Sequence, residues 1–145
     1  MAKFQFRLQR ILDYREQIEE QAKMRLAKIL SLISQKKEQI NQYEQELEQI
    51  SKMISMGNLS ENSLWLYKES EKNILLSIDQ LKKELKDLSQ KAEILRQDLI
   101  LKTIERKKLE KLKQKDHERF IYEEQKREQK EIDEISTLRY EKSLN

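Results

Sequence analysis

The residues of this chain that could do acid–base chemistry are its adjacent carboxylates and its one histidine. The adjacent carboxylates include Glu123–Glu124 and Asp133–Glu134, and the histidine is His117. General acid–base catalysis requires a cleft that buries such groups and shifts their pKa values. One histidine cannot form a two-histidine metal site or a Ser-His-Asp triad. We therefore expect His117 to be a solvated residue on a charged helix face.

Composition excludes phosphate-binding loops and thiolate sites. The chain has 145 residues with one glycine, no proline and no cysteine. One glycine cannot build a glycine-rich phosphate loop, and a chain without cysteine has no disulfide or thiolate metal ligand. The net charge of +3 arises from 30 basic and 27 acidic residues. This near balance argues against nucleic acid as a partner, because nucleic-acid-binding proteins usually concentrate basic charge.

The elements that must position the charged groups are two long helices. Charged residues make up 39% of the chain, and the scarcity of glycine and proline indicates helices with few turns. Apolar residues recur at alternating three- and four-residue spacings, which is the heptad period of helices packed lengthwise. In the first half these seam residues are Leu8, Leu12, Ala22, Leu26, Ile29, Ile33, Ile40, Tyr43, Leu47, Ile50 and Ile54. In the second half they are Ile74, Ile78, Leu81, Leu85, Leu88, Ala92, Leu95 and Leu99.

The two sets of seam residues pair in antiparallel fashion about the only glycine, Gly57. The pairing aligns Ile33 with Leu85 and has its midpoint next to Gly57. Gly57 is suited to the left-handed conformation that ends a helix, and Asn58 or Ser60 can cap the next helix. The turn residues are therefore Gly57 and Asn58.

The predicted fold is all-α: a long two-helix antiparallel coiled-coil hairpin that forms a single domain over residues 1–145. Its predicted boundaries are helix 1 at about 4–56, a turn at 57–60 and helix 2 at about 61–140. The second helix is longer and extends alone beyond the first from about residue 116. A two-helix hairpin has no cleft, so we expect a monomer with no enzyme activity, cofactor or metal. No apolar run reaches the roughly 20 residues that span a bilayer, so we expect no membrane insertion.

Polar residues interrupt the seam in two places. Lys36 faces Leu81, where its stem can lie along the seam with the ammonium group in water. Near the termini, Arg15 is placed opposite Lys102 and Glu19 opposite Leu99. The second helix carries a basic run there, interspersed with Glu105 and Glu110: Lys102, Arg106, Lys107, Lys108, Lys111, Lys113 and Lys115. These cations would repel one another unless carboxylates intervene, so we interpret this end as splayed or engaged by an acidic partner.

Two further groups of apolar residues lie off the seam. Trp65 either contacts a partner, as aromatic anchors commonly do, or folds over the turn and staples it. Beyond about residue 116, apolar side chains have no partner in this chain: Phe120, Ile121, Tyr122, Ile132, Ile135, Leu138 and Tyr140. This segment is either a helix that docks into a groove or a disordered tail.

The two ends of the sequence resemble the FliJ family of the bacterial flagellar type III export apparatus. The opening, Phe4 to Arg15 (FQFRLQRILDYR), looks like the N-terminus of that family. The segment Glu123 to Glu134 (EEQKREQKEIDE) is similar to its C-terminal signature. The resemblance covers essentially the whole chain. It implies a cytoplasmic protein peripherally associated with the cytoplasmic face of the membrane at the flagellar base.

The resemblance also implies the partners. A member would be a stalk that inserts in the hexameric export ATPase ring, promotes its assembly and activity, and links it to the cytoplasmic domain of the export gate and to substrate chaperones. We expect the end that bears the termini to enter the ring, through Arg15, Glu19, Lys102, Arg106, Lys107, Lys108, Phe120 and Tyr122. We expect contact with the gate or a chaperone through Trp65, Tyr67, Ser70, Ile74, Ser77 and Leu81. The family often carries an aromatic residue in this face, where the present chain has Ser70.

Two other interpretations remain open. The chain can be a generic coiled-coil scaffold or chaperone of a related type III secretion system. It can also be a coiled coil associated with nucleic acid. Copurification with the export ATPase would separate the stalk from the scaffold, and the salt dependence of DNA binding would test the third interpretation.

Overall fold

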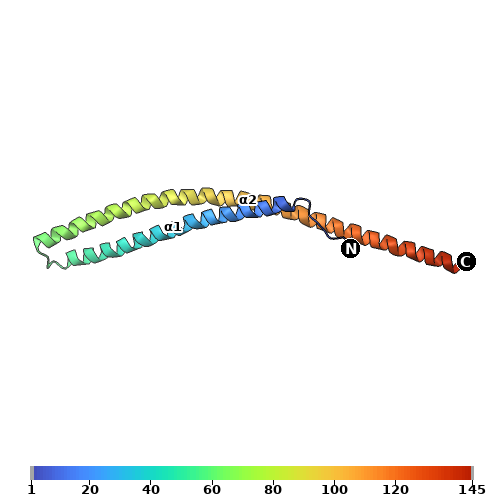
Figure 1. Ribbon diagram of the computed structural model, residues 1–145. Helices are drawn as coiled ribbons and strands as arrows, with labels where there is room; N and C mark the ends of the chain where they lie inside the picture. Colours follow the sequence, from blue (N-terminus) through green and yellow to red (C-terminus); the bar gives the residue numbers. More distant parts are fainter. Residues whose placement is uncertain (1, 145) are drawn as a thin grey trace. The chain divides into compact units, whose positions relative to one another are not determined.

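A computed structural model describes residues 2–144, which form two α-helices and no strand. Helix α1 spans Gln9–Ser55 and helix α2 spans Glu61–Leu144 (Figure 1). Contacts divide the described chain into two compact units, the turn unit (residues 20–100) and the terminal unit (residues 2–19 and 101–144). The predicted all-α hairpin with a longer second helix is confirmed. In the described residues, neither helix has a stretch long and apolar enough to cross a bilayer.

The seam residues hold the two helices together in both units. Every one of them is buried or half-buried. In the turn unit the most buried are Ala22, Leu26, Ile40, Ile78 and Ala92. The alanines allow the helix backbones to approach closely, whereas leucine and isoleucine fill the wider parts of the interface. Apolar burial between α1 and α2 therefore follows the predicted antiparallel alignment.

The turn between the helices is organised by Gly57 and Ser60. The amide of Met56 donates to the Lys52 carbonyl over 3.2 Å, and Gly57 then has a φ of 72°. This is the left-handed conformation predicted for Gly57. At the start of α2, the Ser63 amide donates to Ser60 Oγ over 3.3 Å. Ser60 rather than Asn58 is therefore the cap of α2.

Charged side chains cross between the helices at positions displaced from the predicted register. Lys36, aligned with Leu81 by the seam, instead pairs with Glu84, three residues further along α2, over 3.0 Å. A helical side chain leans towards the N-terminus of its own helix. In an antiparallel pair, two directly aligned side chains therefore lean in opposite directions. A long side chain of α1 instead meets a residue of α2 that lies farther from the turn than the aligned one. Arg25 and Asp98 form a second such pair, at 3.7 Å.

The first helix begins later than predicted. It starts at Gln9, not at about residue 4, and the residues before it are not helical. The Gln9 amide donates to the Phe6 carbonyl over 3.1 Å, and the Phe6 side chain is buried. The non-helical segment follows α2 past the start of α1 (Figure 1). Burial of aromatic side chains against α2 outweighs the hydrogen bonds that another helical turn would add.

Replacing Gly57 with valine should lower the melting temperature. An added Cβ would meet nothing within 4 Å, so the cost comes from the backbone conformation alone, about 1–2 kcal/mol for an L-residue. Circular dichroism should show unchanged helix content before melting. Gly57→Asn is the matched control, because asparagine tolerates this conformation. Equal melting of the valine and glycine proteins would exclude a structural role for the positive φ.

The ion pair between Lys36 and Glu84 should make the stability depend on pH. A hydrogen bond from Lys36, and secondarily one from Gln80, lowers the pKa of Glu84 below its ordinary value of 4.5, against a smaller opposing effect of burial. A lowered pKa stabilises the folded state above the ordinary value, and this contribution disappears as the pH falls through the lowered pKa. The Glu84→Gln protein should therefore lose less stability than the parent between neutral pH and pH values below 4.5.

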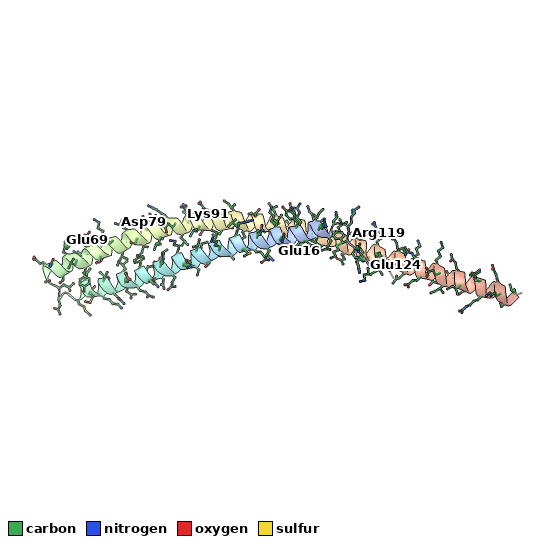
Figure 2. The ribbon with its side chains drawn as sticks, in the orientation of Figure 1. Glu16, Glu69, Asp79, Lys91, Arg119 and Glu124 are labelled. Carbon is green, nitrogen blue, oxygen red and sulfur yellow. The ribbon has the colours of Figure 1, made fainter. Side chains whose placement is uncertain are left out.

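The measurement is the denaturant midpoint across this pH range. The control is Glu69→Gln, which removes an exposed carboxylate of α2 that forms no ion pair among the described residues. Figure 2 labels Glu69 on α2 in the turn unit. An identical pH profile for Glu84→Gln and the parent would show that the pair with Lys36 contributes nothing.

Candidate functional site

A charged cluster joins the two helices of the terminal unit. Glu19 is only 5% exposed, and its carboxylate accepts a hydrogen bond from Nε of Arg106. Arg106 Nη1 also pairs with Glu110 Oε1 over 2.8 Å. The hydrogen bond to Glu19, followed by that to Glu110, raises the pKa of Arg106, while burial opposes the effect. This guanidinium is therefore held between two carboxylates of its own chain.

A second ion pair in the terminal unit confirms that carboxylates separate the cations. Arg15 Nη1 lies 2.6 Å from Glu105 Oε2, three residues beyond the position of Lys102 with which the seam aligns Arg15. Glu19 likewise reaches Arg106, seven residues beyond its aligned position at Leu99. The prediction of a splayed end is wrong for these residues, because Arg15 and Arg106 pair with Glu19, Glu105 and Glu110 of this chain. The alternative, that this end is engaged by an acidic partner, stays a prediction.

The residues predicted to contact the ATPase therefore divide into two groups. Arg15, Glu19 and Arg106 connect α1 to α2, and Lys102 on the same side of α2 is half-buried. Lys107 and Lys108 are exposed. A partner can reach these two lysines without breaking an ion pair of the hairpin.

An aromatic cluster joins the segment before α1 to α2. The ring centroid of Phe4 lies 4.9 Å from that of His117, with an interplanar angle of 75°, and 5.6 Å from that of Phe120. His117 is exposed as predicted, with one face of its environment formed by the Phe4 ring. The prediction that Phe120 has no partner in this chain is wrong. The signal available in the sequence was the pair Phe4 and Phe6 ahead of the first seam residues. Tyr122 is 62% exposed.

Helix α2 continues alone after this cluster. Residues 125–144 are all exposed and helical, and Figure 1 shows α2 extending past the start of α1. The structure thus has the helix and not the disordered tail. Its exposed apolar side chains include Ile132, Ile135 and Leu138. An ion pair within the helix, between Arg127 and Glu124 at 3.1 Å, supports it locally.

In the turn unit, several large apolar side chains of α2 are exposed. Trp65 is 60% exposed, so it does not fold over the turn as a staple. Leu66, Leu75 and Leu76 are also exposed. Sequence reasoning missed Leu75 and Leu76, although the run from Ile74 to Leu76 contains more apolar residues than one seam requires.

The other residues predicted to contact the gate or a chaperone are less accessible. Tyr67, Ile74, Ser77 and Leu81 are half-buried, and Ser70 is exposed. A shallow groove between the helices is lined by residues of both, including Tyr43, Leu76, Ser77 and Leu81. Trp65 is therefore the most accessible apolar member of the predicted contact set, and the exposed Leu76 lies beside Ser77 and Leu81 in the groove. In the described chain, no three histidine or carboxylate side chains are grouped so as to hold a metal.

The pair between Glu19 and Arg106 should favour one alignment of α1 with α2 and stabilise the hairpin. Arg106→Leu leaves the buried Glu19 without this partner and should lower the free energy of unfolding by up to about 3 kcal/mol, discounted because the Arg106 side chain is 20% exposed. The double variant Glu19→Leu/Arg106→Leu removes both charges and should recover most of that loss. Denaturant unfolding of the two variants measures the difference. Additive losses would exclude coupling between the two side chains.

A comparison with models of protein families identifies the family of this chain. The family model described as Flagellar FliJ protein matches residues 4–145. No curated protein and no solved structure matches the chain. The matched region includes the aromatic cluster, the turn and α2 as far as its described end, so it covers both units. The chain belongs to the flagellar FliJ protein family.

Proposed function

We propose that this component of the flagellar export apparatus is a stalk that inserts in the hexameric export ATPase ring and promotes its assembly and activity. The observation that carries the proposal is the helix α2 of the terminal unit, which continues alone after the aromatic cluster at Phe4 and is exposed throughout residues 125–144. A single solvated helix is narrow enough to enter a pore. Family membership supports the same role.

The chemistry of the terminal unit suits a shaft that binds without locking in place. The outward side chains beside α1 are largely charged, and Lys107 and Lys108 are exposed. Charged contacts at a surface are individually weak and are screened by salt over about 8–10 Å at physiological ionic strength. A large dry apolar patch would instead hold the ring in one orientation. We therefore assign the ATPase contact to Lys107, Lys108 and Tyr122, with Glu19 and Arg106 holding the hairpin closed behind them.

The exposed apolar side chains of the turn unit provide a second contact, for the cytoplasmic domain of the export gate or for substrate chaperones. Trp65, Leu75 and Leu76 are exposed, and aromatic residues often anchor interfaces. In this role the protein is a non-enzymatic monomer that links the ATPase to other parts of the apparatus. It works in the cytoplasm, at the membrane face where the flagellar base lies.

Reversing the charge of Lys107 and Lys108 should reduce stimulation of the export ATPase. The Lys107→Glu/Lys108→Glu protein should remain folded, because neither lysine forms an ion pair in the described chain. ATP hydrolysis by the purified ATPase, with and without the variant, measures the effect at low and at raised salt. The control is Lys82→Glu/Lys86→Glu, which makes the same charge change on exposed lysines of the turn unit.

Trp65→Ala should spare ATPase stimulation and weaken binding to the gate domain or to a chaperone. A pulldown with each purified partner provides the second measurement. If Trp65→Ala abolishes stimulation while the reversed lysines stimulate normally, the turn unit enters the ring and the orientation proposed here is wrong. Normal stimulation by both variants would remove Lys107, Lys108 and Trp65 from the ATPase contact.

A further inference from the structure

In the terminal unit, the side of α2 that is turned away from α1 carries six of the nine basic residues between Leu101 and Lys126. Its members are spaced by three and four residues, so they share one side of the helix. We call this surface the basic strip. It consists of the exposed residues Leu101, Ile104, Lys107, Lys108, Lys111, Lys115, Glu118, Arg119, Tyr122 and Lys126. Figure 2 labels Arg119 in the strip and Glu16 on α1 of the same unit.

The charge of the basic strip is unbalanced. It contains six cations and one carboxylate, a net charge of +5, whereas the whole chain has +3. The two carboxylates that interrupt the basic run in the sequence do not neutralise it. Glu105 pairs with Arg15, and Glu110 pairs with Arg106. Both carboxylates are thus used in ion pairs with arginines outside the strip.

The lysines of the strip are available to an external anion. Among the described residues, no carboxylate lies within ion-pair distance of Lys107, Lys108, Lys111 or Lys115. The one carboxylate of the strip, Glu118, accepts a hydrogen bond from Gln114 over 3.4 Å. The chain therefore leaves the charge of these four ammonium groups to be balanced by solvent ions or by a partner.

Apolar side chains lie on the same side of the helix as these lysines. Ile104 is 44% exposed and Leu101 is more exposed, and both precede the lysines. Tyr122 follows them, with Lys126 Nζ 5.6 Å from the centroid of its ring. Lysine stems, a tyrosine ring and aliphatic side chains together match the interface of a bilayer, where charges meet headgroups and apolar groups enter the acyl boundary.

We propose that the basic strip binds directly to the surface of an anionic phospholipid bilayer. The strip is the convex side of a helix and offers no cavity for a small anion, whereas a planar array of phosphates can meet all its lysines at once. Nucleic acid carries the same phosphates, but its backbone gives Leu101 and Ile104 no apolar region to enter. The proposal goes beyond the stalk function, in which the chain is near the membrane only through its protein partners.

The strength of this binding should be modest and sensitive to salt. Each lysine near an anionic bilayer is worth about a fivefold change in the partition coefficient, which corresponds to ~1 kcal/mol and falls off within a Debye length. Because Lys107, Lys108 and Tyr122 belong both to the strip and to the proposed ATPase contact, one copy cannot use them for both partners at the same time.

The test is flotation of the full chain with vesicles of phosphatidylcholine alone or mixed with phosphatidylglycerol, at low and high salt. We expect binding to the mixed vesicles only, and Lys111→Gln/Lys115→Gln should weaken it roughly 25-fold. The matched control is Lys82→Gln/Lys86→Gln, which has the same spacing and charge change on exposed lysines of the turn unit and should bind normally. Ile104→Ser should reduce the binding that persists at high salt. Circular dichroism verifies that each variant is folded.

Three outcomes would overturn the proposal. The first is failure of the parent chain to float with the mixed vesicles. The second is an equal loss in the Lys111/Lys115 variant and its control, because overall charge and not the strip would then be responsible. The third is tighter binding to duplex DNA than to the mixed vesicles at the same salt, because the strip would then be a nucleic-acid surface. ATPase stimulation, measured without vesicles, tests the stalk function separately.

Discussion

Apolar contact along one line between α1 and α2 is the interaction on which the rest of the structure depends. A two-helix hairpin has no interior beyond this seam, so each seam residue is at best covered by side chains of the facing helix and its own neighbours. The seam sets which residues of α2 face outward, and it thereby determines where the basic strip and the exposed Trp65 lie. The polar pair of Glu19 and Arg106 sits within the same line and selects one alignment of the helices over its neighbours.

Much of this architecture follows from heptad spacing and a single glycine. Apolar spacing predicts the seam, because burial on a helix surface depends mainly on position around the helix. Spacing alone does not identify the charged partners, since Lys36 reaches Glu84 and not the aligned Leu81. The lean of side chains along each helix accounts for this displacement and could be added to such a prediction. The late start of α1 was not predictable from periodicity. It goes with contacts between Phe4 and the rings of His117 and Phe120, which are more than 100 positions away in the sequence.

The candidate surfaces were predicted only in part. The sequence places cations and carboxylates side by side in the basic run, and this mixture obscures their different roles. Folding separates them, because Glu105 and Glu110 pair with arginines near the seam while Lys111 and Lys115 remain outward. A net charge averaged over the chain therefore underestimates the field that a partner meets at one surface. In the turn unit, Leu75 and Leu76 are exposed beside an otherwise regular seam.

The turn at Gly57 has a consequence for how the hairpin forms. Contacts near Gly57 close short loops, whereas the pair Glu19–Arg106 joins residues 87 positions apart and the pair Arg15–Glu105 joins residues 90 apart. Loop-closure entropy rises with separation, by about 0.6 kcal/mol for each doubling. Contacts between the helices should therefore form first beside Gly57 and then at increasing distance from it, with the terminal ion pairs forming last. On heating, contacts should be lost first near the termini and last beside Gly57. Slow amide exchange should therefore be concentrated in the turn unit, and exchange should be fastest where α2 has no contact with α1.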